Sequence, residues 1–179
     1  MAASSSEWAS LFDRAAGKVN ARLVGDEDAG ERERPYPVLV HKWDDFSMFV
    51  GSEEVSKNLF GLKETGIQAC LLCDDQLSPL FPKDFDYEKI SLIDDADVDL
   101  TMVFPITFEY LATAKSRSQS ILLACKTGTS LSCAIAISFL MQERKIPYDE
   151  AYAQLLSVQP LLSINSGFEK HLRALESSS

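Results

Sequence analysis

The segment that most constrains the fold is residues 121–142, where a strand-like run passes through a short loop into a helix. Four apolar residues, Ile121 to Ala124, lead to Cys125, and the loop that follows contains one glycine and three hydroxyl residues. The residues after the loop are apolar enough for a buried helix. A strand that turns directly into a helix is typical of layered α/β folds.

The same turn is a candidate anion site. Backbone N–H groups of a tight strand–helix turn point toward one spot at the positive end of the helix dipole. A thiol held there would be partly ionised, which makes Cys125 a candidate nucleophile. The alternative is an ordinary strand–turn–helix connection in which Cys125 is only a small buried residue. The segment is not a Walker A loop, because no Gly–Lys–Ser/Thr sequence is present in it.

The rest of the chain alternates short apolar runs with segments of helical spacing. Strands are predicted over residues 38–43, 46–50, 67–73, 87–93 and 121–125, and helices over 52–65, 98–115, 130–142, 148–158 and 166–175. Pro105 marks a boundary or a kink within the second of these helices. The alternation predicts an α/β domain with a central mixed, mostly parallel sheet and helices on both faces.

The length of 179 residues predicts one domain with a short appendage. Apolar residues recur at helical spacing over 6–23, and the run 25–34 is rich in charge, so residues 1–34 are predicted to be an amphipathic helix and a solvated linker. Residues 35–176 form the predicted domain body. Residues 177–179 are three serines and are predicted to be a disordered tail.

Charge and cysteine usage exclude several classes of function. Lys and Arg number 17 against 27 Asp and Glu, and the net charge of −10 disfavours binding to nucleic acid or to an anionic membrane. The N-terminal residues lack a signal-peptide pattern, so we expect a cytoplasmic protein with reduced thiols. Cys70 and Cys73 have C-x-x-C spacing, which could indicate redox chemistry or half a zinc site, but their apolar surroundings favour a buried strand.

Residues 124–132 read A-C-K-T-G-T-S-L-S and resemble the signature loop H-C-x-x-G-x-S-R-S of the dual-specificity, cysteine-dependent protein phosphatases. The resemblance places Cys125 on the nucleophile, Gly128 on the loop glycine, and Ser130 and Ser132 on the two serines. It implies a phosphate-binding loop made of Lys126, Thr127, Gly128, Thr129, Ser130 and Leu131. The chemistry implied needs no cofactor and no metal.

Further segments extend the resemblance over residues 35–176. They are residues 49–52, 62–67, 87–94, 139–141, 147–152 and 164–168, and the third of them places Asp94 on the general acid. The resemblance therefore implies a phosphatase-like α/β domain in which Cys125 attacks the phosphoester, Asp94 protonates the leaving oxygen and Ser132 assists departure of the thiolate.

Two positions depart from the family pattern. Leu131 stands where the family has an arginine, and Ala124 stands where it has a histidine. The arginine grips two phosphate oxygens, and deleting a comparable preorganised group lowers a rate by about 10²–10³-fold. Lys126 could supply a point charge without the bidentate geometry, although an ordinary solvated lysine is the alternative.

These features lead to three functional hypotheses. The first is a catalytically impaired member, a pseudophosphatase, that binds a phosphoprotein or a partner shared with active phosphatases or kinases. The second is a working tyrosine/serine/threonine phosphatase that uses Cys125 and Asp94. The third is a loop that binds no anion, with the partner-binding surface elsewhere. No nucleic-acid or membrane partner is expected.

Overall fold

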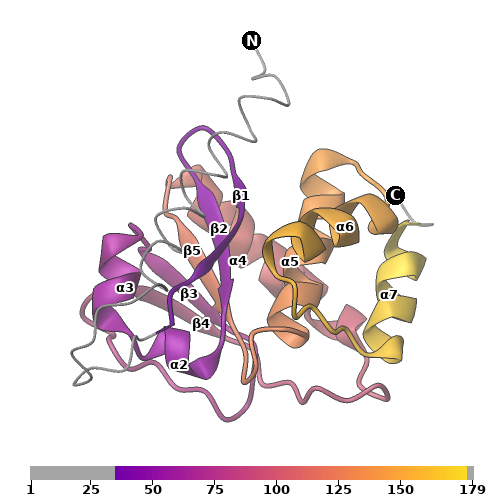
Figure 1. Cartoon of the computed structure of the whole chain (residues 1–179), viewed down its shortest axis with the longest axis horizontal. Helices are drawn as coiled ribbons and strands as arrows, with labels where there is room; N and C mark the ends of the chain where they lie inside the picture. Colours follow the sequence, from indigo (N-terminus) through magenta and orange to yellow (C-terminus); the bar gives the residue numbers. More distant parts are fainter. Residues whose placement is uncertain (1–34, 177–179) are drawn as a thin grey trace, which may run out of the picture. The chain divides into compact units, whose positions relative to one another are not determined.

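The protein is described by a computed structural model of residues 35–176 (Figure 1). The helix and linker predicted for residues 1–34, and the tail 177–179, lie outside the described residues. The strands are β1 (Val38–Lys42), β2 (Ser47–Gly51), β3 (Ala69–Leu72), β4 (Asp86–Lys89) and β5 (Ile121–Ala124). Each predicted strand is present, and β3 and β4 are shorter than expected.

The five strands form one sheet in the order β1-β2-β5-β3-β4. β1 pairs antiparallel with β2, and all other neighbours are parallel. The prediction of a mixed, mostly parallel sheet is therefore confirmed. In the register of the sheet, Ala124 at the end of the central strand lies opposite both Gly51 and Leu72. The carboxyl ends of β2, β3 and β5 consequently meet at one edge, where ligands bind in open α/β sheets.

Helices cover both faces of the sheet (Figure 1). The smaller core cluster contains Val55 and Leu62 from α2 (Glu53–Ser56) and α3 (Leu59–Glu64). The larger cluster is built from α4 (Phe104–Ser116), α5 (Leu131–Arg144), α6 (Tyr148–Val158) and α7 (Ser166–Glu176). Every residue from Leu131 to Met141 is buried, as expected of a helix that is apolar on all sides. Within residues 35–176, none of the helices combines the length and apolar character needed to cross a bilayer.

The prediction of a single helix over residues 52–65 is wrong. Residues 52–65 form two helices, α2 and α3, which are separated at Lys57 and Asn58. Asn58 is buried and caps α3, because its Oδ1 accepts a hydrogen bond from the Gly61 N–H at 3.0 Å. Its Nδ2 donates to the carbonyl of Pro35 at 3.2 Å, which ties the break to the start of the domain body.

The predicted boundary at Pro105 is confirmed. A 3₁₀ turn, η1 (Leu100–Val103), precedes α4, and Pro105 lies in the first turn of that helix. Proline is tolerated there because its missing N–H would have no partner within the helix.

Cys70 and Cys73 lie in different core clusters, on opposite faces of the sheet. Burial raises the pKa of the Cys70 thiol to about 12 and raises that of Cys73 well above its usual value. Two thiols on opposite faces cannot hold one metal ion together. The interpretation of this segment as a buried strand is therefore confirmed, and all four cysteines are free thiols.

Candidate functional site

The loop after β5 is pressed against the backbone that joins β2 to α2. Gly128 has φ +74°, and a Cβ at this position would lie 2.6 Å from the Ser52 nitrogen and 2.7 Å from the Gly51 carbonyl carbon. Two further bonds hold the contact: the Cys125 N–H donates to Gly51 O at 3.2 Å, and the Glu53 N–H donates to Lys126 O at 3.3 Å. Only glycine combines this left-handed backbone with so close an approach.

The Cys125 thiol lies inside this loop and is 2% exposed. Its Sγ accepts a hydrogen bond from the Gly128 N–H at 3.3 Å, and it lies 3.1 Å from the Ser132 hydroxyl at the start of α5. The structure thus brings together Cys125, Gly128 and Ser132, three of the residues that the motif singled out.

Asp94 lies beside the loop but is held there by other polar groups. Its Oδ1 accepts hydrogen bonds from the Ser130 hydroxyl at 2.9 Å and from Asn165 Nδ2 at 2.8 Å. Asn165 also caps α7, because its Oδ1 accepts from the Phe168 N–H at 2.9 Å. The role of Asp94 as general acid stays a prediction, and the structure places its side chain beside the loop. Sequence reasoning did not identify Asn165 as part of the site.

Leu131 does not act as a ligand-facing loop residue. It is the first residue of α5, its side chain is fully buried, and it belongs to the larger core cluster. Ala124 is equally buried and belongs to the smaller cluster. At both positions where the family pattern has a polar side chain, this chain therefore places an apolar side chain in a core.

The backbone N–H groups of the loop only partly converge on the sulfur. The Gly128 N–H points at Cys125 Sγ, whereas the Lys126 N–H donates to Asp74 Oδ2 at 3.3 Å and the Thr129 N–H donates to the Thr127 hydroxyl at 3.3 Å. Asp74 follows β3, whose end lies next to β5 because the Cys73 N–H bonds to Ala124 O at 2.7 Å. At the predicted anion site, N–H groups that an anion would use therefore already donate to acceptors of the protein itself.

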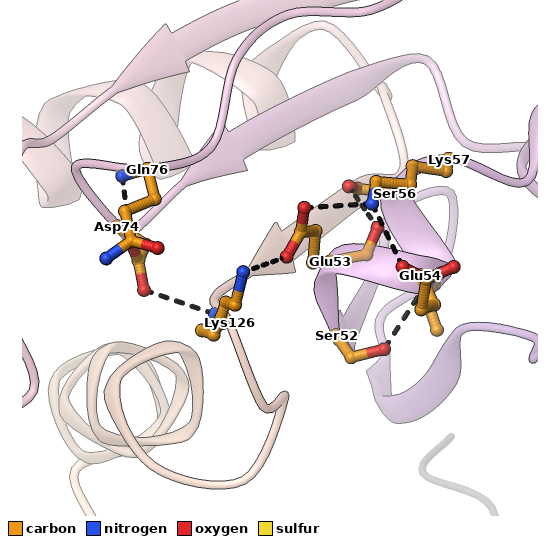
Figure 2. Close-up of polar contacts among 9 residues, drawn as sticks. Ser52, Glu53, Glu54, Ser56, Lys57, Asp74, Gln76 and Lys126 are labelled. Carbon is orange, nitrogen blue, oxygen red and sulfur yellow. Dashed lines mark hydrogen bonds and ion pairs between the residues drawn. The ribbon is translucent and has the colours of Figure 1, made fainter.

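Lys126 is the single basic residue in residues 125–131, and its ammonium group is directed toward α2. Figure 2 shows it paired with the carboxylate of Glu53, at 2.5 Å. Glu53 also pairs with Lys57 at 2.8 Å. The hydrogen bond from Lys126, followed by that from Lys57, lowers the pKa of Glu53 to about 2, so this carboxylate stays charged at neutral pH. Sequence reasoning did not find Glu53 or Asp74.

Comparisons with known proteins agree with this geometry. A family model described as dual specificity phosphatase, catalytic domain, matches residues 48–178. Dual specificity protein phosphatase 1 of Arabidopsis thaliana is 30% identical over 147 residues, which are 82% of this chain and 72% of that protein. Protein phosphatase Slingshot of Drosophila melanogaster is 24% identical over 143 residues, 80% of this chain but 13% of that much longer protein.

A mouse putative dual specificity phosphatase, solved in complex with zinc tungstate, has the same fold. It superposes with a TM-score of 0.73 at 24% identity, over 86% of this chain and 94% of that chain.

Proposed function

The chain belongs to the dual-specificity phosphatase family, and on that premise we propose that it is a catalytically impaired member that acts by binding a protein partner. One observation carries the proposal: the residue at the position of the family's arginine, Leu131, is fully buried in the core. A leucine offers neither a donor nor a charge to the oxygens of a transferring phosphoryl group. Loss of such preorganised stabilisation lowers the rate by about 10²–10³-fold or more.

No other group in the loop replaces the lost guanidinium. Lys126 carries the only positive charge in the loop sequence, and that charge is paired with Glu53. A lysine supplies a point charge without the planar fork that binds two phosphate oxygens. The structure therefore supports a loop whose shape persists and whose electrostatic contribution to catalysis is lost. We also infer a cytoplasmic setting, which four free cysteines support.

Residual hydrolysis is the second candidate, and the contacts of Cys125 favour it. A Cys125 thiolate could attack phosphorus and form an S–P bond while the P–O bond breaks and Asp94 gives a proton to the leaving oxygen. Water would then cleave the S–P bond, and the Ser132 hydroxyl, 3.1 Å from the sulfur, would donate to the departing thiolate. In this chain one oxygen of Asp94, Oδ1, already accepts hydrogen bonds from Ser130 and Asn165, which constrains the side chain.

Turnover of p-nitrophenyl phosphate tests the proposal. We expect the wild-type protein and a Cys125→Ser variant to give the same rate within error. Cysteine-dependent turnover at the level of Arabidopsis thaliana dual specificity protein phosphatase 1, assayed alongside, would refute impaired catalysis.

Restoring the lost groups provides the second arm. Leu131→Arg and the double variant with Ala124→His are compared with Leu131→Met, which conserves volume and stays apolar. We expect a cysteine-dependent gain only in the variants that contain arginine and that retain the wild-type circular dichroism spectrum. A Leu131→Met variant as active as the arginine variants would show that the arginine position is not what limits the rate.

A further inference from the structure

Lys126 is engaged by carboxylates at both of its donor groups, and the two acids come from different parts of the sheet edge. Its ammonium pairs with Glu53, the first residue of α2, and its backbone N–H donates to Asp74, which follows β3 (Figure 2). The backbone amide and the side chain of Lys126 are two of the donors that this loop could offer to an oxyanion. Both are already used within the protein.

Asp74 is built into the structure. It is 7% exposed, and both of its carboxylate oxygens have N–H partners: Oδ1 accepts from Gln76 at 2.9 Å and Oδ2 from Lys126 at 3.3 Å. A buried carboxylate is tolerated when its oxygens are hydrogen-bonded in this way. Asp74 therefore occupies a fixed place beside the loop.

Glu53 is more exposed than Asp74 but has several partners. Its carboxylate pairs with Lys126 and with Lys57, and the Glu53 N–H donates to the carbonyl of Lys126. A ligand that needs the Lys126 ammonium would have to displace a charged carboxylate that belongs to the same protein.

We propose that Glu53 and Asp74 are specificity-determining residues that exclude phosphate and related oxyanions from the loop. An oxyanion next to Lys126 would compete with two carboxylates for the same donors and would be repelled by both. The proposal rests on the partner-binding role proposed above in one respect: a partner of this domain makes its contacts without placing a phosphate in the loop. A phosphoprotein partner, as expected from the sequence, would present its phosphate elsewhere.

Tungstate, an oxyanion with the charge and shape of phosphate, is the probe. Its affinity is measured by isothermal titration calorimetry for the full-length wild type, Glu53→Gln, Asp74→Asn and the double variant. These substitutions remove a charge and keep the size of the side chain. We expect the wild type to bind weakly and each substitution to tighten binding by about tenfold, the scale of removing one like charge nearby. Lys126→Met in the double variant should abolish the part of the gain that comes from Glu53→Gln, because it removes the ammonium group and keeps the backbone N–H.

The chain offers two matched controls. Glu54→Gln removes a neighbouring charge that pairs with Lys57 and is not bonded to Lys126. Asp75→Asn removes the charge of the residue next to Asp74. Both should bind tungstate like the wild type. An unchanged affinity in the double variant, or an equal gain in the controls, would overturn the proposal. If Asp74→Asn fails to fold, Glu53→Gln against Glu54→Gln decides the same question.

The turnover assay and the tungstate titration can refute their two proposals independently of each other. Cysteine-dependent turnover in the wild type at the level of the Arabidopsis thaliana enzyme would refute impaired catalysis, whatever the tungstate affinities are. Equal tungstate affinities with and without the carboxylates would refute the exclusion by Glu53 and Asp74, whatever the turnover is.

Discussion

Substitution of Gly128 by alanine tests whether the loop is held by contact with the backbone between β2 and α2. The chain provides a control with the same backbone conformation, because Gly66, which follows α3, also has φ +74°. A Cβ at Gly66 would meet nothing within 4 Å, whereas a Cβ at Gly128 would lie 2.6 Å from Ser52 N and 2.7 Å from Gly51 C. The two variants therefore share the cost of the left-handed conformation and differ in the contact.

The magnitudes follow from these two environments. A left-handed alanine costs about 1–2 kcal/mol, and the stiffer unfolded chain offsets about 0.4–1 kcal/mol of that. Gly66→Ala should thus lower the free energy of unfolding by about 1 kcal/mol. Gly128→Ala adds overpacking against backbone atoms that cannot rotate away, which contributes a further 1–3 kcal/mol or so. We expect a total loss of about 2–4 kcal/mol at Gly128.

Urea unfolding of both variants, followed by circular dichroism, measures the difference. The free energy of unfolding should fall further for Gly128→Ala than for Gly66→Ala, with unchanged m-values. Equal losses at the two positions would refute the reasoning, because they would show that the loop does not press on residues 51–52.

Two further predictions concern His41 and Asn165. Burial, followed by the charges of Arg144 and Lys115, lowers the pKa of His41 to about 4. The unfolded chain therefore takes up a proton below about pH 6.5 while the folded chain does not until about pH 4, so stability should fall as the pH drops between these values. The full shift corresponds to about 3 kcal/mol, and solvent at the half-buried ring reduces it to about 1–2 kcal/mol. A His41→Gln variant should lose that part of the pH dependence in urea titrations at pH 4.5 and 7, and an unaltered slope would contradict the assignment. Asn165→Ala removes the cap of α7 and the bond to Asp94, and should lower the free energy of unfolding by about 1–2 kcal/mol. Asn165→Ser keeps a capping oxygen and should recover part of this loss, whereas an alanine variant of wild-type stability would show that neither bond matters.

Most of the fold follows from local patterns in the sequence. The apolar runs located all five strands, and α6 has the predicted bounds, because a proline precedes it and its apolar spacing is regular. The break between α2 and α3 was missed for a physical reason. Helical spacing continues through residues 57–58, and the break is stabilised by the bond from Asn58 to Pro35, 23 residues away. A local pattern contains no information about such a contact.

The candidate site was predictable where it lies in one segment and not where it is assembled from several. The motif singled out Cys125, Gly128 and Ser132, whose contacts with one another all lie within one segment. Asp74 and Glu53 reach the loop because β3 and β2 flank β5, and this order becomes known only with the sheet. An acid directly after a predicted parallel strand was the available signal for Asp74, since parallel strands end at one edge.

A leucine at position 131 has two consequences, and the family motif predicts only one of them. As a departure from the family motif, it predicts the loss of a phosphate ligand. In the structure it also adds a fully buried apolar side chain, worth about 1.5–3 kcal/mol relative to an exposed one. The same change can thus lower catalytic capacity and raise the stability of the core.

The contact between Gly128 and the β2–α2 backbone has a consequence for how this family diverges. A glycine fixed by packing is retained by selection for folding, whether or not the loop ever meets a phosphate. Packing at position 131 does not require a charged side chain, because Leu131 is fully buried in the core there. Relatives that lose hydrolysis should therefore keep the backbone of the loop after β5 even when its charged side chains have been replaced. Gly128 is therefore a position set by the architecture of the domain, whereas residue 131 is a position where a polar or an apolar side chain decides what the loop can bind.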